Sequence, residues 1–196
     1  RVDLVFEINE GEVTEVRRID FVGNNNFSDS TLRGEILTTE SAWYRFFATN
    51  DTYDPDRITV DRESLRNFYL DEGYVDFRVV SSVAELSPSR DAFFITFTVE
   101  EGERYHFGKI DIVSALKDLD PQTLRGELET DEGDWYNQSL VDETVNTLTE
   151  RISDLGYAFV QVEPVPSKDA VNRTVGITYQ IREGPRVYVE RIDIKG

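Results

Sequence analysis

The sequence repeats itself, and no other feature restricts its fold as strongly. A segment in which apolar residues alternate with other residues ends at a Glu-Gly pair, and it occurs three times, with glycines at Gly11, Gly102 and Gly184. These glycines lie 91 and 82 residues apart, and a second strand-like segment after each pair keeps the same spacings. Self-similarity of this kind indicates a tandem array of structural repeats.

This register divides the 196 residues into four parts. Residues 1–12 are expected to form the last strand of a preceding repeat, and 185–196 the first strand of a following one. Residues 13–102 and 103–184 are two complete repeats. The chain is therefore expected to be a piece of a longer array.

Each complete repeat predicts the order β-α-α-β-β. After the first strand, Ser28 and Asp120 are residue types that cap helix N-termini well. Apolar residues at helical spacing mark the second helix in both repeats: Ile58, Leu65 and Tyr69 in the first, and Val141, Val145, Leu148 and Ile152 in the second. These helices end at Gly73-Tyr74 and Gly156-Tyr157, because glycine readily adopts the left-handed conformation of a helix end. We predict an α+β fold in which two helices cover one face of a three-stranded sheet.

Composition excludes several classes of function. The 21 basic and 39 acidic residues give a net charge of −18, which disfavours nucleic acid and anionic membranes as partners. The chain has no Cys, so it contains no disulfide or thiolate metal site, and its single histidine, His106, excludes a two-histidine metal site. We expect no cofactor and no metal.

Catalysis finds no support in the motifs. The acidic residues are scattered, and nothing places two carboxylates in an apolar pocket where one pKa would rise, as a carboxylate-based hydrolase requires. A Thr-Leu-Arg-Gly-Glu pentapeptide occurs at 31–35 and again at 123–127, but it lacks phosphate-loop spacing and a basic cluster. We predict that the chain is not an enzyme, and we keep the hydrolase as a remote alternative.

An aromatic insertion distinguishes the first repeat. The segment between its helices is about nine residues longer than the equivalent in the second repeat. The insertion contains Trp43, Tyr44, Phe46 and Phe47, and a large apolar loop often marks a contact site. We consider it a candidate docking loop, with internal packing against its own repeat as the alternative.

A three-stranded sheet also leaves two open edges, which can accept extended peptides. Alignment of the repeats at Gly73 and Gly156 places Ser81 and Val83 opposite two prolines of the second repeat, and proline cannot donate a main-chain hydrogen bond. We therefore predict binding at the proline-free strand of the first repeat, where Val80→Pro should weaken it. The strand comprises Val75, Asp76, Phe77, Arg78, Val79, Val80, Ser81, Ser82 and Val83. Gly102, between the repeats, is a candidate hinge.

The pattern resembles a known family. The β-α-α-β-β order, the Gly-Tyr pair after the second helix and the Glu-Gly pair before the next repeat are similar to POTRA domains. The run of residues 65–74, Leu-Arg-Asn-Phe-Tyr-Leu-Asp-Glu-Gly-Tyr, and the aromatic insertion resemble more narrowly the third repeat of outer-membrane β-barrel assembly factors. The shorter second repeat, with Tyr157-Ala158, resembles the fourth.

The resemblance implies a location and partners that composition and periodicity do not provide. It implies a periplasmic array in front of a C-terminal outer-membrane barrel in a Gram-negative bacterium. The array would receive unfolded outer-membrane proteins and dock accessory lipoproteins, and a periplasmic chaperone is a further candidate partner. The alternative within the family is the POTRA array of a secretion or autotransporter-assembly pore.

Overall fold

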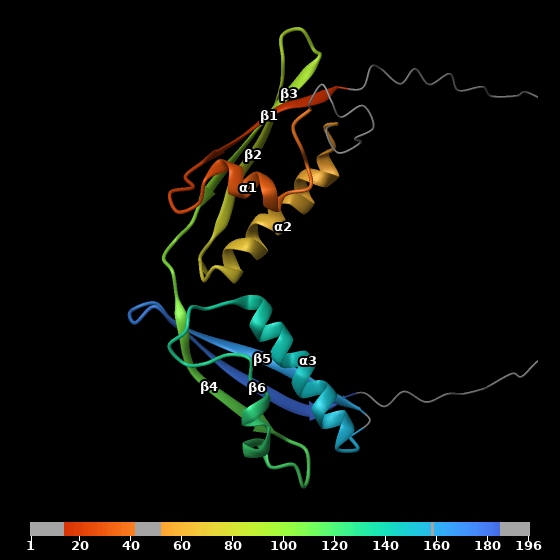
Figure 1. The fold of residues 1–196 in the computed structure, drawn as a ribbon, viewed down its shortest axis with the longest axis vertical. Coiled ribbons are helices and arrows are strands. Elements are labelled where there is room, and N and C mark those ends of the chain that lie inside the picture. Colours follow the sequence, from red (N-terminus) through yellow and green to blue (C-terminus); the bar gives the residue numbers. More distant parts are fainter. Residues whose placement is uncertain (1–13, 42–51, 158, 185–196) are drawn as a thin grey trace, which may run out of the picture. The chain divides into compact units, whose positions relative to one another are not determined.

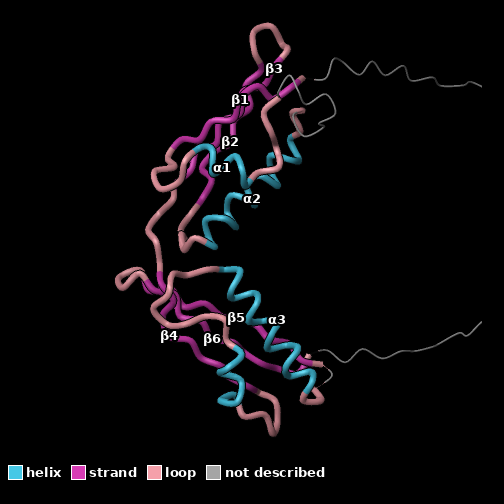
Figure 2. Tube along the Cα trace, in the orientation of Figure 1, coloured by secondary structure: helices cyan, strands magenta, loops and turns pink. Residues whose placement is uncertain are grey.

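A computed structural model describes residues 14–41, 52–157 and 159–184 (Figure 1). The chain divides into two compact units, residues 1–68 with 76–101, and residues 69–75 with 102–196. Each unit contains one three-stranded mixed sheet and its helices, which confirms the predicted α+β fold (Figure 2).

The first unit has the predicted element order. Its elements are β1 (Glu15–Val22), α1 (Asp29–Glu35), α2 (Pro55–Asp71), β2 (Arg78–Leu86) and β3 (Ala92–Glu100). The strands lie in the order β1-β3-β2, with β3 parallel to β1 and antiparallel to β2. The central position of β3 explains its apolar sequence, because Ile95, Phe97 and Val99 are all buried.

The second unit follows the same plan with β4 (His106–Ser114), η1 (Pro121–Glu127), α3 (Gln138–Asp154), β5 (Val160–Asp169) and β6 (Thr174–Glu183), and its sheet order is β4-β6-β5. Its first helix is a 3₁₀ helix rather than an α-helix, as is common for short helical segments. The predicted caps are confirmed, because Ser28 accepts a hydrogen bond from the Thr31 N–H and Asp120 from the Gln122 N–H.

The apolar stripe of α3 is confirmed, since Val141, Leu148 and Ile152 are buried in the core of the second unit. In α2, Leu65 and Tyr69 are fully buried as predicted. Between Ile58 and Leu65, the helix buries a residue that the apolar pattern did not predict. This residue is Asp61, which is acidic and fully buried.

In the first unit, the strand after the second helix starts later than predicted. Residues 75–77 form a turn, and β2 begins at Arg78. The cause is local: after Gly73, whose φ is 90°, the Val75 N–H donates to the Gly73 carbonyl oxygen (3.2 Å) and keeps the chain in a turn. Phe77 is buried just before the strand. Because β2 begins at Arg78, Val75, Asp76 and Phe77 are not part of it.

Candidate strand-edge binding site

The outer edge of β1 is occupied by the chain itself. The Ile19 N–H donates to Glu40 Oε1 (2.9 Å), and the Ile19 carbonyl oxygen accepts a hydrogen bond from Arg33 Nη1 (2.6 Å). Further along the strand, the Ser41 N–H donates to the Val16 carbonyl oxygen (2.7 Å). The expectation of two open edges is therefore wrong for the first unit, because two charged side chains and the segment after α1 cover one of them.

The corresponding strand of the second unit is covered at its start. The Phe107 N–H donates to the Asp134 carbonyl oxygen (2.8 Å), and the Phe107 carbonyl oxygen accepts from the Gly133 N–H (2.9 Å). The Tyr136 N–H also donates to the Tyr105 carbonyl oxygen (3.0 Å). The turn before α3 thus occupies the first part of the β4 edge.

The outer edge of β2 is open, because no strand among the described residues pairs with it. The register with β3 ends with Leu86 opposite Phe93, and directly beyond this pair the Ser87 N–H donates to the Ala92 carbonyl oxygen (2.8 Å). Hydrogen-bonded and non-hydrogen-bonded pairs alternate in antiparallel strands. It follows that Ser82, Ala84 and Leu86 direct their N–H and C=O groups away from β3.

A bulge changes the alignment on which the sequence prediction was based. Val79 pairs with Val99 and Ser81 with Thr98, so Val80 is an extra residue in β2. A single inserted residue exchanges inward-facing and outward-facing positions in the rest of the strand. Val80→Pro would therefore disturb the bulge rather than a regular outward-facing donor, and a test of the edge belongs at Ser82 or Ala84.

The β5 edge of the second unit is interrupted by proline at outward-facing positions. The Gly184 N–H donates to the Phe159 carbonyl oxygen (2.9 Å), so the alternation in register with β6 directs the backbone of Pro164 and Pro166 away from β6. Neither proline has an N–H to offer.

Residues of the β2 and β5 edges can be matched through their partners on the central strands, β3 and β6. Ser82 pairs with Phe97 and Pro164 with Tyr179, and both partners stand five residues before the glycine of a Glu-Gly pair. By the same comparison Ala84 corresponds to Pro166. The two prolines of β5 therefore match Ser82 and Ala84, each one position further along β2 than the sequence alignment indicated.

Apolar side chains flank the open edge. The residues concerned are Val80, Val83 and Leu86, which are 51%, 47% and 45% exposed. An added strand would therefore gain hydrophobic contacts as well as main-chain hydrogen bonds. Of the predicted site residues, the structure places residues 78–83 on this edge and extends the edge to Leu86.

Two other predicted sites, the docking loop and the hinge, are not tested by the structure. The candidate docking loop, Trp43, Tyr44, Phe46 and Phe47, lies outside the described residues. Gly102 has a φ of 74°, a backbone conformation that favours glycine, and it is the first residue of the longer of the two segments that make up the second unit. A hinge at Gly102 stays a prediction.

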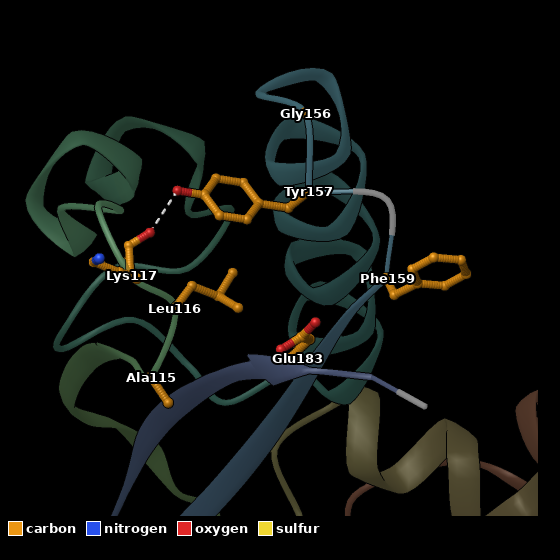
Figure 3. Close-up of a pocket in the computed structure, with 7 residues that line it drawn as sticks. All are labelled: Ala115, Leu116, Lys117, Gly156, Tyr157, Phe159 and Glu183. Atoms are coloured by element: carbon orange, nitrogen blue, oxygen red, sulfur yellow. Dashed lines mark hydrogen bonds between the residues drawn. The ribbon is translucent and has the colours of Figure 1, made fainter. Parts of the chain in front are cut away.

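The second unit also contains an open cavity of about 540 Å³ (Figure 3). It is lined by Ala115, Leu116, Lys117, Gly156, Tyr157, Phe159 and Glu183. Tyr157 reaches across it and its hydroxyl donates to the Lys117 carbonyl oxygen (2.8 Å), whereas the ring of Phe159 points away from Leu116. The lining offers one acid and one base, and it lacks the pair of carboxylates that a glycosidase-like site requires.

Hydrogen bonds, neighbouring charges and burial shift the pKa values of several described side chains. Hydrogen bonds from the Ser89 and Ser87 hydroxyls lower the pKa of the Asp91 carboxyl far below its usual range. The pKa of Asp111 is lowered chiefly by Lys109, and burial raises the pKa of the Tyr136 phenol to about 12. Within the described ranges, no group of three or more potential metal ligands occurs, and no helix is long and apolar enough to cross a membrane.

Sequence reasoning missed the residues that close the β1 edge. Arg33 belongs to the repeated pentapeptide, and its guanidinium bridges the Ile19 carbonyl oxygen and Glu40. The repetition of the pentapeptide was a usable signal, because the matching Arg125 lies 3.5 Å from Asp111 of β4. The pentapeptide therefore positions an arginine beside the first strand of each unit.

The fold and its open strand edge define a class of protein, the tandem POTRA module. The family model described as POTRA, surface antigen variable number repeat, matches residues 14–102 and 105–184. The chain belongs to the POTRA family.

Its relatives include outer-membrane assembly factors. The chain is 27% identical over its whole length to outer membrane protein assembly factor BamA of Neisseria meningitidis serogroup B, and 30% identical to BamA of Neorickettsia risticii. It spans 25% and 26% of the lengths of these relatives. The crystal structure of Haemophilus influenzae BamA POTRA3-5 has the same fold, with a TM-score of 0.73 at 22% identity, covering 94% of this chain and 74% of that one.

Proposed function

We propose that this chain is a periplasmic binding and scaffolding module of the outer-membrane protein assembly machinery, and that its β2 edge receives extended segments of unfolded outer-membrane proteins. The observation that supports this most directly is the set of outward-directed N–H and C=O groups at Ser82, Ala84 and Leu86. Hydrogen bonds to main-chain groups depend little on the sequence of the added strand. An edge of this kind therefore suits a receptor for many different substrates.

The relatives' names support the same proposal, since both are called assembly factors. The chain covers only about a quarter of each relative. The partners of the whole protein are therefore proposed here as well. We infer that accessory lipoproteins, and a periplasmic chaperone, dock on the same array. The aromatic segment at Trp43 is our candidate for one such contact, and Gly102 is our candidate hinge.

The proposal predicts where an extended peptide binds. Titration of the isotopically labelled chain with a peptide from an outer-membrane β-strand should shift the amide resonances of β2 more than those of β5. The same peptide with a central proline should bind less tightly, because proline removes a donor and resists the extended ladder. Larger shifts along β5 would contradict the proposal and assign the binding edge to the second unit.

A further inference from the structure

A group of arginines lies beside the start of the open edge, in a chain whose net charge is −18. Arg62 and Arg66 are one turn apart on α2, and Arg78 is the first residue of β2. They surround a cavity of about 190 Å³, large enough for a side chain or two. The cavity is lined by Arg62, Glu63, Arg66, Phe77, Arg78 and Val79.

Two of these arginines have no partner among the residues that the structure describes. Several other arginines of the first unit are paired: Arg17 lies 3.3 Å from Asp91, and Arg33 lies 3.5 Å from Glu40. Arg78 Nε donates to Glu100 Oε2 (2.8 Å). Among the described residues, the guanidinium groups of Arg62 and Arg66 make no ion pair and no hydrogen bond. Glu63 is the only acid in the lining, so the cavity is less acidic than most of the chain's surface.

The geometry of an added strand indicates which of its groups could enter the cavity. Side chains of a β-strand alternate between the two faces of its sheet. Every second side chain of a strand added to β2 would therefore point toward the helix layer that carries Arg62 and Arg66. A terminal carboxylate would instead continue along the strand direction, within the plane of the sheet. The planar fork of donors in a guanidinium can bind a carboxylate through two parallel hydrogen bonds.

We propose that this cavity binds the side-chain carboxylate of an Asp or Glu in a segment that has added to the β2 edge. The proposal rests on the proposed function and adds a preference to it. Main-chain pairing with Ser82, Ala84 and Leu86 holds the segment, and Arg62 and Arg66 select an acidic residue and fix the register of the added strand.

The experiment uses capped, amidated peptides of alternating Thr, Val and Tyr, with a single Glu moved through each position, and the Gln version of each. Binding to the 196-residue chain is measured by NMR titration. At one position, or at two positions of the same face, Glu should bind about tenfold more tightly than Gln. The gain should vanish in R62Q/R66Q and at about 1 M NaCl, where the Debye length is roughly 3 Å.

The matched control R17Q/R90Q removes two positive charges at the other end of the sheet, and it should keep the gain. Loss of the gain in that control, its survival in R62Q/R66Q, or a gain only from a free terminal carboxylate would overturn the proposal. If Glu and Gln bind alike while the amides of Ser82, Ala84 and Leu86 shift, the carboxylate site is wrong and the proposed edge stands. If no peptide shifts those amides, both fail together.

Discussion

Replacing Ser82 and Ala84 by proline is expected to weaken the binding of an extended peptide by roughly tenfold or more, since each lost main-chain hydrogen bond contributes about 1 kcal/mol. Both residues direct their N–H groups away from β3, so the substitution spares the internal ladder. The second unit shows that the fold accepts proline here, because β5 carries Pro164 and Pro166 at the matching positions and stays paired with β6. Isothermal titration calorimetry with a peptide from an outer-membrane β-strand measures the change.

The conservative variant S82T/A84V retains both N–H groups and should bind like the original chain. The reciprocal variant P164S/P166A restores two outward donors on β5 and should create a second binding edge. Unchanged affinity in S82P/A84P, with the fold intact by circular dichroism, would contradict the assignment of the edge.

Asp61→Ala is expected to lower the free energy of unfolding of the first unit by about 3 kcal/mol, because it leaves two N–H groups without their acceptor. Asp61 is fully buried, and its Oδ1 accepts hydrogen bonds from the Leu37 N–H (2.7 Å) and the Thr38 N–H (3.2 Å). The carboxylate thereby attaches the chain after α1 to α2. Native-state hydrogen exchange at core amides of the first unit, such as Ile95 and Phe97, measures the loss.

The second unit supplies the control for this variant. Thr144 is fully buried at the matching position of α3, and its Oγ1 accepts a hydrogen bond from the Glu129 N–H (3.1 Å). Asp61→Thr should therefore lose less stability than Asp61→Ala. Equal losses in the two variants would mean that packing volume, rather than the hydrogen bonds, determines the effect.

Periodicity was sufficient to predict the layers of each unit. Alternation marked the central strands, because Ile95 and Phe97 must be buried while their neighbours are not. Helical spacing likewise predicted Val141, Leu148 and Ile152 in the core. These patterns succeed because the buried face of a strand or helix requires apolar residues at a regular spacing along the whole element.

The edges were harder to predict because they depend on single residues. The extra residue Val80 shifts the rest of β2 by one position, and nothing in its chemistry distinguishes it from an ordinary strand valine. The closure of β1 depends on Arg33 and Glu40, which are brought to Ile19 only by the tertiary fold. Asp61 was missed because the helical spacing from Ile58 to Leu65 places Arg62, rather than Asp61, on the face that carries the apolar residues.

The addition of a strand to β2 is tested most directly by hydrogen exchange of individual amides in the presence and absence of a bound peptide. The amides of Ser82, Ala84 and Leu86 should exchange at least about tenfold more slowly when the peptide is bound, because each gains an acceptor. The amides of Ser81, Val83 and Glu85, which already bond to β3, should change much less. Saturating peptide that leaves the exchange of Ser82, Ala84 and Leu86 unchanged would contradict strand addition at this edge.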